Sequence, residues 1–145
     1  MNISPELYSD MTRRASPKSN SRVNVPAAFV TGGSICVIGQ LILSALEGYG
    51  ISHSSAALWT SVILIVSSSL LTGPGLYGRL ARFAGAGTLV PITGFSNAIS
   101  SAAIEARSEG FILGVGTKIF TIAGPVILYG SAASVLYGII YYLIM

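Results

Sequence analysis

The charged residues of this chain divide it into four long uncharged runs. The runs are Val23 to Leu46, Gly48 to Gly78, Phe83 to Ile104, and Ile119 to Met145. Each is long enough for a helix that crosses a bilayer, which needs about 20 residues. Apolar residues are nearly continuous in three of these regions, so the pattern predicts membrane-spanning helices near residues 27–46, 56–77 and 111–143.

The run from Phe83 to Ile104 breaks this pattern, because its first half reads GAGTLVPITG, from Gly85 to Gly94. Glycine, proline and threonine make this stretch a poor helix, and it is too interrupted for a strand. Non-helical backbone survives at membrane depth only where protein buries it or water reaches it. We therefore expect a re-entrant segment at residues 83–104, covered by an oligomer or by partner subunits. Such turns commonly build permeation paths, although a surface loop at the membrane interface fits the same residues.

Composition supports an all-α integral membrane protein. Of the 145 residues, 52% are hydrophobic and 9% are charged, whereas a soluble domain carries about 25% charged residues. The single Cys36 excludes an intrachain disulfide, and His53 lies in a serine-rich stretch with no evident acidic partner nearby. Because these residues and the scattered glutamates match no metal or catalytic spacing, we expect no enzyme, no metal and no cofactor.

The basic residues are concentrated at the N-terminus, although the net charge is only +3. Half of them precede the first span: Arg13, Arg14, Lys18 and Arg22. This bias places the N-terminus on the cytoplasmic side and favours contact with anionic lipid over binding to nucleic acid. Residues 1–24 are predicted to be a polar, mobile tail, and residues 25–145 form the membrane domain.

Two topologies follow for the second half of the chain. With the tail inside, Glu47 and His53 lie outside, and Arg79 and Arg82 lie inside. If the Gly85 segment dips in and returns, residues 105–109 stay inside and the last helix ends outside. If the segment crosses, both assignments reverse.

Polar side chains also recur within the predicted spans. On the first span, one helical face carries Gly33, Cys36, Gln40, Ser44 and Glu47. This face is suited either to packing against another helix or to lining a pore. On the last span, a similar row contains Gly114, Lys118, Thr121, Pro125 and Tyr129. Lys118 is a functional candidate because it is ionisable, with snorkelling to the interface as the alternative. Pro125 predicts a kink, either a hinge or a packing bend.

Three stretches of the sequence resemble a known family. They are FVTGGSICVIGQ, RFAGAGTLVPITGFSNAI and EGFILGVGTKIFTIAGPVILYG, and they closely resemble the stage V sporulation protein AC family over about residues 27–138. A sister family, protein AE, shares the GAG...VPITGF core, but the basic tail and GTKIFTIAGPV favour AC. The chain departs from the family pattern at Gly78, where an acidic residue is common, and at GFSNA, where GFANS is more usual.

The resemblance implies a subunit of the spore inner membrane. Its implied partners are an AE-type (AEb) membrane subunit and the soluble stage V sporulation protein AD. Together they move dipicolinic acid with Ca²⁺ into the developing spore and out at germination, and the AC subunit is proposed to be a tension-gated channel. A scaffold subunit, or one repeat of an alternating-access carrier, remains an alternative for this chain.

Dipicolinate is a flat aromatic dianion, so its path needs hydrogen-bond donors and a modest positive potential without tight binding. The candidates for the permeation path are Gln40, Gly85, Gly87, Thr88, Pro91, Thr93, Gly94, Asn97 and Lys118. Gly94 and Pro125 are the candidates for a hinge.

Overall fold

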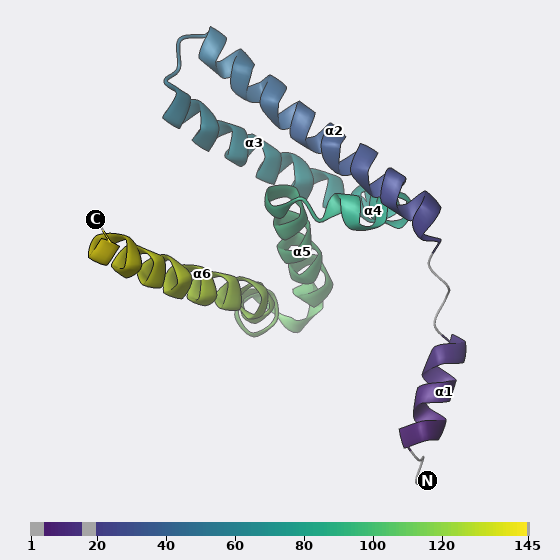
Figure 1. Ribbon diagram of the computed structural model, residues 1–145. Coiled ribbons are helices and arrows are strands. Elements are labelled where there is room, and N and C mark those ends of the chain that lie inside the picture. Colours follow the sequence, from purple (N-terminus) through teal and green to yellow (C-terminus); the bar gives the residue numbers. More distant parts are fainter. Residues whose placement is uncertain (1–4, 16–19, 145) are drawn as a thin grey trace.

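The computed structural model describes residues 5–15 and 20–144, and these ranges are built from helices (Figure 1). In chain order the elements are α1 (Pro5–Ala15), α2 (Ser21–Gly48), α3 (His53–Thr72), α4 (Leu76–Ala84), the 3₁₀ turn η1 (Gly85–Thr88), α5 (Pro91–Glu105), the 3₁₀ turn η2 (Ala106–Glu109), the π-helical turn η3 (Phe111–Gly116) and α6 (Thr117–Ile144). The predicted all-α class is confirmed.

Three helical stretches of the described chain are long and apolar enough to cross a membrane: Ser21–Gly48, His53–Thr72 and Phe111–Ile144. They overlap the three predicted spans. The second is displaced, because α3 ends at Thr72 rather than near Tyr77. Pro74 has no N–H to donate to a helix, and Gly75 adopts φ +76°, a left-handed conformation that turns the chain. Tyr77 therefore belongs to α4.

The predicted N-terminal tail contains helix α1, which begins at Pro5. Proline suits the first position of a helix. Lys18 and residues 1–4 lie outside the described residues. The first span also begins earlier than predicted, since α2 starts at Ser21.

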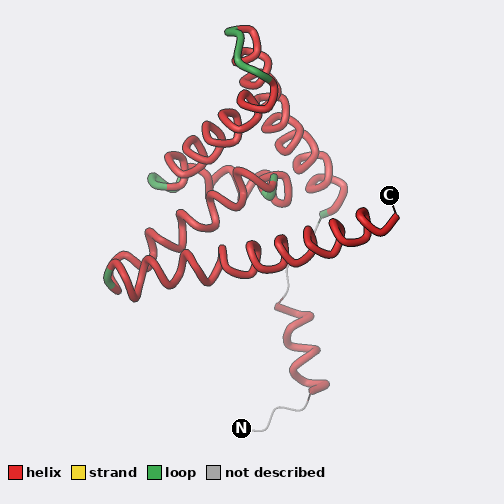
Figure 2. Tube along the Cα trace, turned by 90° about the vertical axis from the view of Figure 1, so that its left-hand side faces the viewer, coloured by secondary structure: helices red, strands yellow, loops and turns green. Residues whose placement is uncertain are grey.

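The helices α2 and α3 form an antiparallel hairpin, joined by a short turn at residues 49–52 (Figures 1 and 2). α4 and η1 pack against the N-terminal part of α2, and α5 packs across α3. α6 follows α5 through the turns η2 and η3, contacts α5, and then extends away from the other helices (Figure 1). Along its whole described length, Thr117–Ile144, none of its residues is buried. The surface of α6 is therefore left for lipid or for other subunits.

The length of α5 bears on the two topologies. Its 15 residues span about 22 Å, which is less than the roughly 30 Å of a hydrocarbon core. This favours the topology in which the segment returns to the side from which it entered, so that η2 lies on the side of the N-terminus.

Candidate functional site

The broken segment and α2 meet through their backbones. A Cβ atom built on Gly87 would clash with the carbonyl oxygen of Ala28 and would lie 2.8 Å from the Ala28 Cα. A Cβ on Gly32, one turn further along α2, would lie 3.3 Å from the Gly87 carbonyl oxygen. Glycine at position 87 therefore permits the contact, because any side chain there would force η1 and α2 apart.

The stretch that we expected to be a poor helix contains the 3₁₀ turn η1 and the first turn of α5, and only residues 89 and 90 between them are non-helical. Groups of the chain itself satisfy the backbone at this break. The Tyr77 hydroxyl of α4 donates to the Thr88 carbonyl oxygen at 2.9 Å, and both residues are buried. The Thr88 hydroxyl donates to the Gly85 carbonyl oxygen at 3.0 Å, and the Leu89 N–H donates to the Ala86 carbonyl oxygen at 3.1 Å. α2 and α4 already cover Gly87 and Thr88, whereas Leu89 is 74% exposed, so the expected cover by other subunits stays a prediction for the rest of the segment.

The first turn of α5 is tightly packed. Gly94 donates its N–H to the Val90 carbonyl oxygen at 2.7 Å, and a Cβ on Gly94 would lie 2.9 Å from the Thr88 carbonyl oxygen. Thr93, beside it, is only 6% exposed, and its hydroxyl oxygen has no hydrogen-bond partner among the described residues. A buried hydroxyl without a partner is costly, so Thr93 is an unusual residue that calls for an explanation.

Seven polar residues join α3 to α5, and we call this set the hydroxyl seam. Its members are Ser68, Ser69 and Thr72 of α3, and Thr93, Ser96, Asn97 and Ser100 of α5. The Ser68 hydroxyl donates to the Thr93 carbonyl oxygen at 2.7 Å. The Thr72 hydroxyl lies 2.9 Å from the amide oxygen of Asn97. These contacts place the first three turns of α5 against the last two turns of α3.

Part of the seam is a directed chain of hydroxyl groups. Ser100 donates to Ser69 at 2.9 Å, Ser69 lies 2.9 Å from Ser96, and Ser96 donates to the Ile65 carbonyl oxygen at 2.8 Å. Each hydroxyl has one proton. Because the proton of Ser96 is used on Ile65, Ser69 must donate to Ser96. The hydrogen bonds in such a chain polarise one another. This chain carries no net charge.

The structure brings most of the predicted path residues together. Seven of them lie in η1 or in the first two turns of α5: Gly85, Gly87, Thr88, Pro91, Thr93, Gly94 and Asn97. The serines of α3 that complete the seam were not among the candidates. Their signal was the run Ser67 to Ser69 inside an apolar span.

Gln40 and Lys118 do not join this group. Gln40 is exposed on α2 and donates only a long bond, 3.4 Å, to Ser44. Lys118 is exposed and lines a cavity of about 280 Å³ with Glu105 and Glu109. This cavity lies at the C-terminal end of α5, about 20 Å along the helix from its first turn.

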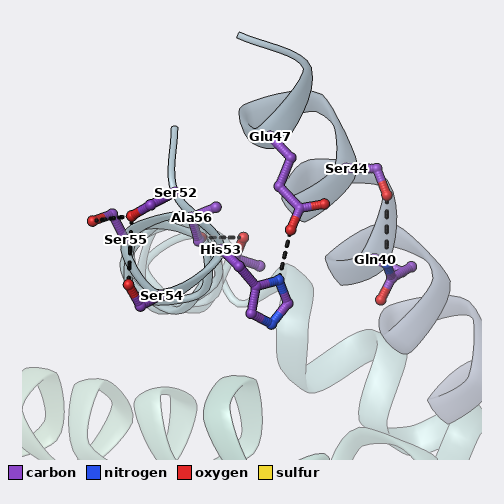
Figure 3. A network of polar contacts seen from close by, with 9 residues as sticks. Gln40, Ser44, Glu47, Ser52, His53, Ser54, Ser55 and Ala56 are labelled. Carbon is purple, nitrogen blue, oxygen red and sulfur yellow. Dashed lines mark hydrogen bonds and ion pairs between the residues drawn. The ribbon is translucent and has the colours of Figure 1, made fainter. Parts of the chain in front are cut away.

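The structure corrects one expectation at the other end of the hairpin (Figure 3). His53 is the first residue of α3, and its Nδ1 lies 2.6 Å from Glu47 Oε1. The sequence suggested no acidic partner, but the hairpin turn brings the end of α2 next to the start of α3. The His53 side chain is 77% exposed, so this contact is worth little to stability.

Comparisons with known proteins agree with these observations. The family model described as SpoVAC/SpoVAEB sporulation membrane protein matches residues 24–140. The chain is 42% identical over 136 residues to stage V sporulation protein AC of Bacillus subtilis (strain 168), which covers 93% of this chain and 91% of that protein. No solved structure matches the chain. With its spanning helices and this match over most of its length, the chain belongs to the SpoVAC/SpoVAEB family of sporulation membrane proteins.

Proposed function

We propose that this chain is a channel subunit that moves dipicolinic acid, together with Ca²⁺, across the spore inner membrane, and that membrane tension opens it. An AE-type membrane subunit and the soluble protein AD are its proposed partners, in an oligomeric complex. Membership of a sporulation membrane family supports the setting. The observation that carries the proposal is the broken segment, in which the 3₁₀ turn η1 and residues 89–90 interrupt the α-helices, held against α2 and α4 and continued by an uncharged hydroxyl seam.

The chemistry of the seam suits a carboxylate permeant. Its hydroxyl groups donate hydrogen bonds without fixed charge, so they hold a dianion weakly enough to release it. The N–H groups of Ile92 and Thr93, in the first turn of α5, have no acceptor within the helix. Together with the Thr93 hydroxyl they form donors that favour an anion at a helix N-terminus.

The described conformation corresponds in this proposal to the closed state. The hydroxyl groups of α3 and α5 bond to each other, and Thr93 is buried. Opening exchanges these contacts for contacts with water, and the net cost is modest because each bond contributes only about 0.5–1.5 kcal/mol. Gly94 and Pro125 are the proposed hinges for this movement.

Gln40 and Lys118 take a different place in the proposal. Both are exposed and distant from the seam, so they line the path only where subunits meet. Replacing Lys118 with Met tests this role in spores. Unchanged dipicolinate release at normal abundance of the complex removes Lys118 from the path.

Conductance of the purified chain is the decisive experiment. The protein is reconstituted in bilayers with dipicolinate as the anion, alone and together with the AE-type subunit, with and without applied tension. We expect stepwise currents that increase with tension. If no current is seen at any tension even with the partner present, the channel assignment is contradicted and a scaffold role is favoured.

A further inference from the structure

Helix α4 presents three different faces. Tyr77 and Ala84 are buried against the rest of the chain. Leucine and phenylalanine side chains form an exposed apolar face: Leu76, Leu80 and Phe83. Arg79 and Arg82 occupy the third face, next to the apolar one. A short helix with an exposed apolar face beside arginines is typical of a helix that lies in the plane of a membrane interface.

A cavity of about 330 Å³ lies beside the basic face. The N-terminal part of α2 lines it with Asn24 and Ala28, and α4 lines it with Arg82 and Phe83. The backbone of η1 closes one side. The cavity therefore combines one guanidinium group with apolar walls that continue onto the exposed face of α4.

Among the described residues of α2, α3, α4 and η1, the charged side chains at this end of the hairpin are arginines. Arg22, two residues before Asn24, and Arg79 lie at the same end of the hairpin. The sequence contains no aspartate or glutamate between residues 11 and 46 or between residues 48 and 104. Arg82 has no hydrogen-bond or ion-pair partner among the described residues. A guanidinium group in this setting favours a phosphate, which it binds with two parallel hydrogen bonds.

We infer that the cavity between α2, α4 and η1 binds the phosphate headgroup of an anionic phospholipid. Arg82 binds the phosphate, and the acyl chains lie along Leu76, Leu80 and Phe83. A free anion would use the arginine but not the adjoining apolar face, so the combination selects a lipid. The Tyr77 hydroxyl bonds to the Thr88 carbonyl oxygen, so the lipid-bound helix is tied to the broken segment. Any effect of the lipid on channel opening rests on the proposed function. The lipid site itself does not.

Fluorescence quenching by brominated lipid tests the site. Phe83→Trp in a Trp59→Phe background places the single tryptophan at the rim of the cavity. The full-length protein is placed in phosphatidylcholine nanodiscs that contain equal small fractions of brominated phosphatidylglycerol or brominated phosphatidylcholine. We expect stronger quenching by the phosphatidylglycerol, because the arginines around the cavity repel the choline cation that follows the phosphate in phosphatidylcholine. If Phe83→Trp fails to fold, Leu80→Trp provides the same readout from the same face.

Two arginine variants provide the matched comparison. Arg82→Gln is expected to weaken the preference for phosphatidylglycerol about tenfold, because it removes both the charge and the charged hydrogen bonds to the phosphate. Arg79→Gln removes the same charge outside the cavity and is expected to leave most of the preference. Equal losses in both variants overturn the site, because they reduce the effect to general surface potential. The site is also overturned if the protein that keeps both arginines shows no preference for phosphatidylglycerol.

A soluble competitor separates a lipid from a free anion. Inorganic phosphate or dipicolinate in the buffer is expected to leave the quenching unchanged. Relief of quenching by either one overturns the lipid assignment in favour of a soluble anion. None of these measurements requires conductance, so a silent channel with an intact lipid preference contradicts only the proposed function.

Discussion

At the residue scale, Gly87 is the position where the smallest change has the largest expected effect. In Gly87→Ala, the added methyl group overlaps the backbone of Ala28. Forced overpacking of this kind typically costs about 1–3 kcal/mol, and here neither backbone has a flexible side chain that can move away. We expect a lower unfolding temperature in detergent and reduced abundance in the membrane. Gly130→Ala in α6 is the control, because nothing lies within 4 Å of a Cβ at Gly130; an equal loss in both variants contradicts the explanation.

Thr93 separates stability from function. Thr93→Val keeps the shape of the side chain and removes a buried hydroxyl that has no partner among the described residues. Since burying such a group costs about 1–3 kcal/mol, we expect the variant to be at least as stable as the parent. We also expect dipicolinate flux to fall, because the proposed path loses a donor.

A matched threonine controls for the chemistry of the Thr93 substitution. Thr60 is also buried, but its hydroxyl donates to the Ala56 carbonyl oxygen at 2.8 Å. Thr60→Val is expected to bring no gain in the free energy of unfolding and no change in flux. A clear loss of stability in Thr93→Val would instead show that the hydroxyl is already satisfied.

At the scale of elements, the sequence predicted where the chain breaks but not what the break contacts. The chain breaks at Gly85, which adopts φ +53°, a conformation that glycine favours, so the stretch was identified without a structure. Gly94, however, lies inside α5. The partners of Ser68 and Ser69 depend on which helix packs against α3. A serine in a helix can also bond to its own backbone, as Ser61 does to Ala57, so the sequence does not distinguish these cases. Similarly, the row on the last span was predicted for one regular helix, but Gly114 lies in the π-helical turn η3, and η2 and η3 place Lys118 at the far end of α5.

The seam predicts how α3 and α5 hold together. Ser96→Ala removes the central hydroxyl of the directed chain, leaving Ser69 without its acceptor and the Ile65 carbonyl oxygen without its extra donor. Polar contacts between membrane helices average about 0.6 kcal/mol. We therefore expect a modest loss of stability together with a lower tension threshold for dipicolinate release, because only the closed state uses these bonds.

Ser101→Ala is the matched control for the seam. Ser101 lies on the same helix but is exposed, and its hydroxyl bonds within α5 to the Ala98 carbonyl oxygen at 3.1 Å. The Ser101→Ala variant is expected to have the same tension threshold for dipicolinate release as the parent. A raised threshold in Ser96→Ala, or an equal shift in Ser101→Ala, contradicts the claim that the hydrogen bonds of the seam stabilise the closed state.

At the scale of the whole molecule, the spans were predictable from hydropathy, whereas their final surroundings were not. Along α6 the described residues are nearly all exposed, and the polar face of α2 at Gly33 and Gln40 is exposed too. An amide such as that of Gln40 is costly to expose to hydrocarbon. These surfaces are consistent with the proposed oligomer, but one chain cannot specify which subunit covers them.

The topology of the second half provides the last test. In a Cys36→Ser background, single cysteines at Ser108 in η2 and at Tyr142 near the end of α6 are labelled in intact vesicles with a reagent that does not cross the membrane. Because α5 is too short to span the hydrocarbon core and α6 is long enough, the two positions should be labelled from opposite sides. Ser108 should share the side of a cysteine placed at Ser9 in α1, which serves as the reference. Labelling of Ser108 on the side opposite Ser9 would require residues 83–104 to cross completely, and the broken segment would then be part of a fourth span.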